Sequence, residues 1–187
     1  MKILAIETSS RPHGLTARMA QAALEGAREA GAETELVALR DYSVECCRQC
    51  GETGWGDCRT KGECVIDDDF AELVAKMEAA DGFVLATPVY FGDLSEKAKA
   101  FTDRLRRISI APERQGFLKG LPTLGIAAAG GSGGGTPTCL AALEKVLTPP
   151  GCFVVDLIPV ARRNQSYKAE VCRLAGKALV ERPWEEA

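Results

Sequence analysis

Short apolar runs alternate along the chain with longer segments whose apolar residues recur at helical spacing. The runs predict strands at residues 2–6, 34–39, 83–86, 121–128 and 152–160. The amphipathic segments predict helices at residues 15–29, 70–77, 94–108, 139–147 and 171–179. Five strands alternating with five helices predict an α/β fold, a doubly wound parallel sheet with helices on both faces.

One segment interrupts this alternation. Residues 41–64 show almost no periodicity and hold four Gly and five of the eight Cys in the chain. A loop of that length inside a compact domain is usually functional. We therefore expect residues 1–187 to form a single domain with a Cys-rich insertion loop at about 41–66.

Composition narrows the classes of function. The chain has 187 residues, of which 46% are apolar and 26% charged, and its formal net charge is −3. A general nucleic-acid binder would usually be basic. No run of about 18 apolar residues exists, so no membrane-spanning helix is expected, and Glu7 ends the first apolar run too early for a signal peptide. We expect a cytoplasmic protein with reduced thiols and no nucleic-acid or membrane partner.

Ligands of a doubly wound sheet bind at the carboxyl ends of its strands, so the loops after the first, third and fourth strands are candidates. The first loop, residues 8–16, is rich in hydroxyl groups, carries Arg11 and runs into a helix. Hydroxyl donors and free N–H groups at a helix N-terminus suit a phosphate, although an ordinary capped loop is the alternative. No GxGxxG or GxxxxGKS/T motif follows the strand, which argues against a dinucleotide fingerprint and a P-loop.

The other two loops carry aromatic residues and glycines. Tyr90 and Phe91 are adjacent after the third strand, where they either stack on a flat ligand or pack beneath the loop. Residues 130–135 are five Gly and one Ser, which lets the backbone approach a ligand closely or leaves the loop disordered. His13 is the only histidine, and no Cys–His or Ser–His signature supports a catalytic pair, so we expect a solvated loop residue.

Taken together, these segments resemble the NADPH-dependent FMN reductase family, and within it the iron-sulfur flavoprotein branch. The most specific match is TPVYFGDLSEKAKAFTDR, which resembles the family's SPVYFG-S-LKAFIDR. The start, KILAIETSSRPHGLTARM, resembles the family's KILGINGSPRKNGNT, with Thr8 and Leu15 in place of a Gly and an Asn. The resemblance implies a flavodoxin-like fold with a five-stranded sheet in the order 2-1-3-4-5.

The resemblance also implies FMN as cofactor, with the first loop around its phosphate and the other two beside its ring. The implied cofactor-binding residues are Ser9, Ser10, Arg11, Gly14, Leu15, Thr16, Pro88, Val89, Tyr90, Phe91, Gly92, Ala129, Gly130, Gly131, Ser132 and Gly133. No catalytic side chain is needed, because the flavin carries the chemistry. Electrons would pass from NAD(P)H to a flavin, quinone or similar small-molecule acceptor. The alternatives are a flavodoxin-type electron carrier and a Cys-rich metal-binding module that has lost its flavin.

The cysteine segment is similar to the branch's compact motif, CxxCxxC followed by a further Cys. Cys47 and Cys50 fit that spacing, but Thr53 stands where the third cysteine belongs, and Cys58 follows only after the insertion GETGWGD. The expected metal ligands are Cys47, Cys50, Cys58 and Cys64. Four thiolates would bind an iron-sulfur cluster, as the resemblance implies, or a zinc ion. The alternative is a loop of free thiols that binds no metal.

The remaining thiols and cations have simpler expected roles. Cys46 is a spare beside the motif, whereas the cysteines in apolar stretches, Cys139, Cys152 and Cys172, are expected to be buried apolar residues. Four arginines predict a local basic patch on a solvated helix face, namely Arg104, Arg106, Arg107 and Arg114. The resemblance implies a ferredoxin as a further electron donor and assembly as a homodimer or homotetramer.

Overall fold

The computed structural model describes residues 1–182 and residue 184, and its centre is a five-stranded parallel sheet. The strands are β1 (Lys2–Glu7), β2 (Glu33–Ala38), β3 (Gly82–Pro88), β4 (Pro122–Ala129) and β5 (Phe153–Ala161). Their order in the sheet is β2-β1-β3-β4-β5, and every neighbouring pair is parallel. This is the flavodoxin-like order, which confirms the predicted fold class.

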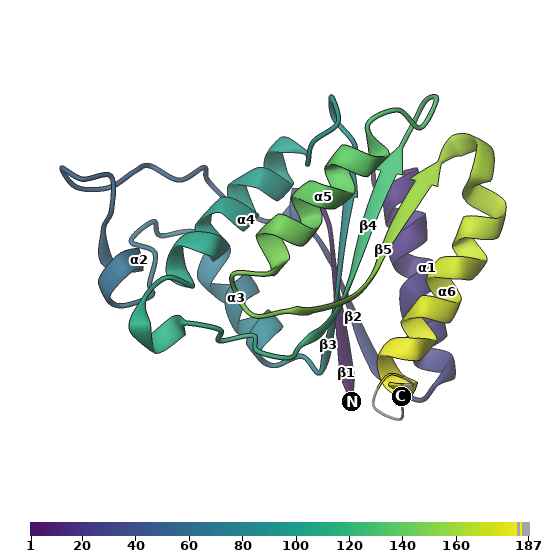
Figure 1. Ribbon diagram of the computed structural model, residues 1–187, viewed down its shortest axis with the longest axis horizontal. Helices are drawn as coiled ribbons and strands as arrows, with labels where there is room; N and C mark the ends of the chain where they lie inside the picture. The colour runs from purple at the N-terminus through teal and green to yellow at the C-terminus, as the bar shows by residue number, and fades with distance from the viewer. Residues whose placement is uncertain (183, 185–187) are drawn as a thin grey trace.

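Helices cover both faces of the sheet (Figure 1). The long helices are α1 (Leu15–Glu29), α3 (Phe70–Glu78), α4 (Glu96–Ile108), α5 (Thr136–Leu147) and α6 (Gln165–Glu181), and the short ones are α2 (Asp57–Thr60), η1 (Leu39–Asp41), η2 (Pro112–Arg114) and η3 (Arg162–Asn164). Helices α1 and α6 lie on one face, and α3, α4 and α5 lie on the other. Successive strand residues point to opposite faces: Ile3 and Ala5 pack under α1 and α6, whereas Leu4 and Ile6 pack under α3 and α4.

Helices α1 and α6 cross at two glycines. A Cβ atom on Gly26 would lie 1.8 Å from the carbonyl oxygen of Arg173, and one on Gly176 would lie 1.8 Å from that of Ala23. Because neither glycine has a side chain, the two backbones come into direct contact. This crossing fixes α1, and with it the loop that precedes α1, against the sheet.

The structure differs from the sequence-based expectations mainly at element ends. Helix α6 begins at Gln165, before the apolar stripe that predicted it, and the Cys-rich segment contains the single helical turn α2. Trp184 of the C-terminal segment packs against Phe153, with ring centroids 6.1 Å apart, while residues 183 and 185–187 lie outside the described part. None of the helices in the described part of the chain is both long and apolar enough to cross a bilayer.

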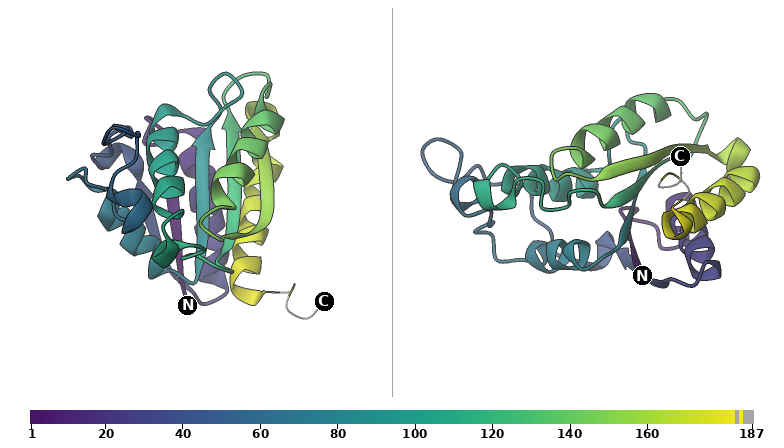
Figure 2. Two further views of the ribbon diagram at one scale, coloured as in Figure 1. Left: turned by 60° about the vertical axis from the view of Figure 1, so that its left-hand side comes forward. Right: turned by 60° about the horizontal axis from the view of Figure 1, so that its bottom comes forward.

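The loops after β3 and β4 project at the same end of the sheet (Figure 2). The cysteine segment leaves the sheet after β2 and lies beyond α3 and α4, away from α1 and α6 (Figure 1). The fold therefore presents two separate regions rich in chemically active residues, one at the strand ends and one outside α4.

Candidate functional site

A cleft of about 820 Å³ opens at the carboxyl ends of the strands. It is lined by Ser9, Ser10, Arg11, Pro12, His13, Gly14, Leu15, Thr16, Arg18, Pro88, Val89, Tyr90, Ala128, Gly130, Arg162 and Gln165. The cleft thus brings together the predicted residues of the first loop, three from the second and one from the third. The other predicted residues, Phe91, Gly92, Ala129, Gly131, Ser132 and Gly133, do not line it.

The first loop is held by its own backbone and by a buried carboxylate. Glu7, the last residue of β1, is fully buried, and its carboxylate accepts a 2.8 Å hydrogen bond from the Ser9 N–H and pairs with Arg40. The Ser9 hydroxyl accepts from the Arg11 N–H at 3.1 Å, and the Gly14 N–H donates to the Arg11 carbonyl at 3.2 Å. These bonds curl the backbone around the N-terminus of α1.

The N-terminus of α1 is open toward the cleft. Gly14 precedes the helix and provides no side-chain cap, and the first turn contains no acidic residue. The first N–H groups and the helix dipole therefore favour an anion at this point. A Cβ atom on Gly14 would lie 3.3 Å from both the Cβ and the carbonyl oxygen of Arg11, so the cradle is narrow. These features fit the phosphate of an FMN molecule.

A buried hydroxyl network joins the first loop to the second. The hydroxyls of Thr8 and Ser95 lie 3.0 Å apart, and the Ser95 N–H donates to the Thr87 hydroxyl at 3.2 Å. Ser95 also caps α4 by accepting from the Ala98 N–H at 3.3 Å. Sequence reasoning missed this network; the serine directly before an amphipathic helix was the pattern that indicated a cap.

The second loop ends in a two-residue hairpin turn. Tyr90 and Asp93 exchange backbone hydrogen bonds of 3.0 and 2.9 Å, and the residues between them, Phe91 and Gly92, have φ of +51° and +82°. Positive φ at both central positions is the geometry of a type I′ turn, which is unusual for a phenylalanine. The Phe91 ring is fully exposed, whereas Tyr90 lines the cleft.

The second and third loops touch each other beside this turn. A Cβ atom on Gly135 would lie 2.6 Å from the Gly92 Cα, and the Thr138 hydroxyl donates to the Gly92 carbonyl at 2.7 Å. Neither Gly92 nor Gly135 lines the cleft, whereas Tyr90 and Gly130 of the same two loops do. The cleft is within the size range of pockets that bind small cofactors.

Two arginines that sequence reasoning missed also line the cleft. Arg18 from α1 donates a 2.7 Å hydrogen bond to Gln165 at the start of α6, and Arg162 follows β5 directly. With Arg11 they place three guanidinium groups around one cleft, which favours a ligand with negative charge. The sequence signal for Arg162 was its place directly after a predicted parallel strand, at the edge of the sheet where ligands bind.

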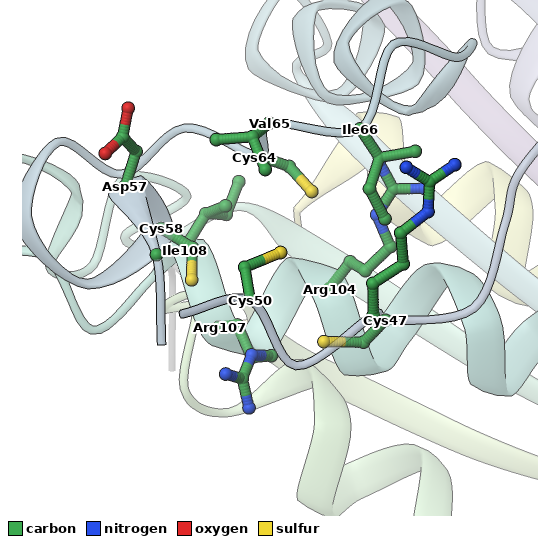
Figure 3. Close-up of a pocket in the computed structure, with 12 residues that line it drawn as sticks. Cys47, Cys50, Asp57, Cys58, Cys64, Val65, Ile66, Arg104, Arg107 and Ile108 are labelled. Atoms are coloured by element: carbon green, nitrogen blue, oxygen red, sulfur yellow. The ribbon is translucent and has the colours of Figure 1, made fainter. Parts of the chain in front are cut away.

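A second, small cavity of about 20 Å³ lies between the cysteine segment and α4. Its lining includes the four predicted metal ligands, Cys47, Cys50, Cys58 and Cys64. Figure 3 shows the four thiols distributed around this space, with Arg104 and Arg107 of α4 beside them. The exposed Cys46 is not part of the lining, and the cleft and this cavity, hereafter the cysteine pocket, share no lining residue.

All eight cysteines are free thiols, and they form two classes. Cys139, Cys152 and Cys172 are buried or half-buried in the core, where burial raises the pKa of their thiols to about 11, 11 and 12. No group of three His, Cys, Asp or Glu side chains in residues 1–182 is arranged to hold a single metal ion. The four thiols therefore do not stand in the arrangement of a tetrahedral zinc site, in which each Zn–S distance is about 2.3 Å.

Arg104 is buried, which corrects the expectation that it belongs to an exposed basic patch. It is 1% exposed and binds Asp68 through two hydrogen bonds of 2.6 and 2.9 Å, because it lies on the same face of α4 as Phe101 and Ile108. Burial alone would lower the Arg104 pKa, but the hydrogen bonds with Asp68 outweigh it and raise the pKa. Its Nε is buried and has no partner among the described residues.

Arg107, one helical turn later, lies in a similar position beside the thiols. Its guanidinium stacks on Trp55, 3.9 Å from the ring centroid, and donates to the carbonyl oxygen of Gly54. Its Nε is also buried without a partner in the described part of the chain. Both arginines line the pocket together with the four thiols, and their two unpaired N–H donors fit a pocket that receives a sulfur-rich, negatively charged group.

Comparisons with known proteins identify relatives of this chain. The model of the NADPH-dependent FMN reductase family matches residues 1–166. An iron-sulfur flavoprotein of Methanocaldococcus jannaschii is 36% identical over 131 residues, which are 70% of this chain and 65% of the relative. One of Methanosarcina thermophila is 35% identical over 156 residues, 83% of this chain and 77% of the relative. The chain therefore spans only about two thirds to three quarters of these relatives.

A solved structure shows the same fold. The NAD(P)H:quinone oxidoreductase from Methanothermobacter marburgensis superposes with a TM-score of 0.71, and the superposition covers 96% of each chain. Its sequence identity to this chain is 18%, so the likeness concerns the fold alone.

Proposed function

Since this chain belongs to the NADPH-dependent FMN reductase family, we propose that it takes electrons from NAD(P)H through a bound FMN and passes them to a small-molecule acceptor. Family membership makes it an FMN-dependent oxidoreductase, and the donor and acceptor are the proposed parts. The acceptor class is a free flavin, a quinone or a similar two-electron acceptor. The observation that carries the proposal is the cleft, where an uncapped helix N-terminus, three arginines and the Pro88–Tyr90 backbone meet.

The first loop and α1 would hold the FMN phosphate. The hydroxyls of Ser9, Ser10 and Thr16, the guanidinium of Arg11 and the open N–H groups of α1 offer the donors that a phosphate requires. The backbone at Val89, Tyr90 and Gly130 would lie beside the ring and orient it. When bound, the flavin supplies hydride acceptance and the release of electrons singly or in pairs.

No side chain is assigned to acid or base catalysis. His13 lies on the rim of the cleft and is exposed. The residues around the cleft instead bind and position the cofactor, and backbone N–H groups near the ring would stabilise negative charge on it.

We further propose that Cys47, Cys50, Cys58 and Cys64 hold an iron-sulfur cluster, with zinc as the alternative occupant. The support is the cavity that the four thiols share and the two buried N–H donors on arginines that line it. Such a centre exchanges single electrons, which would allow a protein donor such as a ferredoxin to supply the flavin.

An absorption spectrum of anaerobically purified protein tests cofactor and cluster together. Flavin bands with a broad brown shoulder, and iron rather than zinc in metal analysis, are the expected result. Steady NAD(P)H oxidation upon addition of a quinone or free FMN is expected as well. Bound flavin without turnover would indicate an electron carrier instead, and a colourless protein that takes up no FMN would contradict the proposal.

A further inference from the structure

Arg107 is a cation without a counter-charge at the edge of the cysteine pocket. The neighbouring Arg104 is neutralised by Asp68, and Asp57, which also lines the pocket, pairs with Lys61 at 2.9 Å. No carboxylate pairs with Arg107 among the residues that the structure describes. The charge of Arg107 is therefore available to whatever the pocket holds.

The hydrogen bonds of Arg107 are also incomplete. One terminal nitrogen donates to the Gly54 carbonyl, and the planar group lies 3.9 Å from the centroid of the Trp55 ring. The Nε–H is buried and finds no acceptor within the described part of the chain. A buried donor without an acceptor is rare in native proteins, and it indicates a missing partner.

The nature of that partner follows from the rest of the lining. Apart from Asp57, whose carboxylate pairs with Lys61 and points away from the thiols (Figure 3), the side-chain acceptors that line the pocket are four sulfur atoms. The other side chains around it are apolar or cationic. A thiolate-bound metal centre supplies sulfur acceptors and negative charge at once. Such a group would provide Arg107 with both a counter-charge and an acceptor for its Nε–H.

We propose that Arg107 donates a hydrogen bond from Nε to the sulfur-rich centre held by the four cysteines and, through its charge, raises the reduction potential of that centre. This inference rests on the proposed iron-sulfur cluster. Reduction adds one negative charge to the centre, so a nearby cation and an N–H donor stabilise the reduced form more than the oxidised form.

Trp55 is the positioning residue for Arg107. It lies in the insertion between Cys50 and Cys58 that separates this sequence from the compact motif. Gly51 and Gly54 have φ of +70° and +75°, and these turns place the indole ring against the guanidinium. The insertion thereby supplies a cation–π stack on Arg107 that the compact spacing has no residue to make.

The test compares Arg107→Gln with Arg106→Gln in anaerobically reconstituted full-length protein. Both variants lose one positive charge from α4, but Arg106 does not line the pocket. Each protein is reduced stepwise with dithionite and mediators, one electron per cluster, and the reduced cluster is followed by electron paramagnetic resonance. At the wild-type midpoint potential, we expect the ratio of reduced to oxidised cluster to fall about tenfold in Arg107→Gln and to stay near one in Arg106→Gln.

Substitutions of Trp55 test the positioning role with the arginine still present. Trp55→Ala is expected to shift the potential in the same direction as Arg107→Gln, and Trp55→Phe, which keeps an aromatic face, to restore it. Iron and sulfide contents are measured in every variant, and Arg107→Lys, which keeps the charge, provides a second series if Arg107→Gln loses its cluster.

The outcomes separate this inference from the function on which it rests. A wild-type protein that takes up no iron contradicts both the cluster and the role of Arg107. A fully loaded cluster whose potential is the same in the wild type, Arg107→Gln and Arg106→Gln contradicts only the role of Arg107, as does an equal shift in both variants.

Discussion

At the residue scale, the Asp68–Arg104 pair anchors the cysteine segment to the rest of the fold. The Asp68 side chain is 3% exposed, and besides Arg104 it accepts a 2.8 Å hydrogen bond from the Glu45 N–H. Arg104 donates a hydrogen bond to the Glu45 carbonyl at 3.1 Å. Both charged side chains therefore bind the backbone of Glu45. Burial would raise the pKa of Asp68, but the hydrogen bonds from Arg104, Glu45 and Phe70 outweigh it and lower the pKa.

Breaking this pair should destabilise the fold strongly. We expect Asp68→Asn to lower the free energy of unfolding at pH 7 by about 3 kcal/mol, because a buried guanidinium loses its counter-charge. The lowered pKa of Asp68 means that its contribution is complete above the unfolded-state value of about 3.9 and is lost as the pH falls through the folded-state pKa. The difference between wild type and variant should therefore shrink below about pH 4.

Urea unfolding of the metal-free proteins at several pH values measures this difference. The exposed Asp67→Asn is the control, with an expected change within about 0.5 kcal/mol. Equal stability of Asp68→Asn and the wild type at neutral pH would show that the pair does not anchor the segment.

The two classes of cysteine should differ in reactivity. With a pKa of about 11, Cys139 and Cys152 would be thiolates in only about one molecule in a thousand at pH 8, and Cys172 in fewer. We expect iodoacetamide to alkylate the loop cysteines of the metal-free native protein and to spare these three. In the metal-loaded protein, Cys46 alone should react rapidly. Peptide mass spectrometry measures the extent of alkylation at each cysteine. If the metal protected Cys46 from alkylation, the assignment of Cys47, Cys50, Cys58 and Cys64 as the ligands would be contradicted.

At the scale of elements, the close crossing of α1 and α6 depends on two glycines, Gly26 and Gly176, which have no side chain to separate the helices. Alanine normally favours a helix over glycine by about 1 kcal/mol. Here Gly26→Ala or Gly176→Ala would force a Cβ into a backbone carbonyl, so we expect either change to destabilise the protein by about 2 kcal/mol. Thermal and urea unfolding measure it, with the exposed Gln21→Ala on α1 as control. A stabilised glycine variant would mean that the helices lie further apart.

Strands and helices were predictable from the sequence where the local pattern of apolar residues determines them. The β-branched run at Lys2–Ile6 and the apolar stripe through Phe70 and Met77 correspond to β1 and α3. The same periodicity placed Arg104 on the buried face of α4, three residues after Phe101, but its charge led to the opposite expectation. Its partner Asp68 lies 36 residues earlier, and no local pattern indicates such a pairing.

At the scale of the whole molecule, topology decides which distant residues meet. The loops after β1 and β3 were candidates from the sequence because parallel strands end at one edge. The order of the sheet then brings Arg162, after β5, and Arg18, on α1, into the same cleft. Those contacts depend on how α6 crosses α1, which the sequence pattern alone does not determine.

The cleft and the cysteine pocket share no lining residue, so their ligands should bind independently. We expect Cys47→Ser/Cys50→Ser to lose its metal while the Kd for FMN, measured by quenching of flavin fluorescence, stays within about twofold. Arg11→Ala should weaken FMN binding about tenfold, since it removes a charged donor, and leave the iron content unchanged. If removal of the metal weakened FMN binding as much as Arg11→Ala does, the two sites would be coupled through α4 or through contacts between subunits.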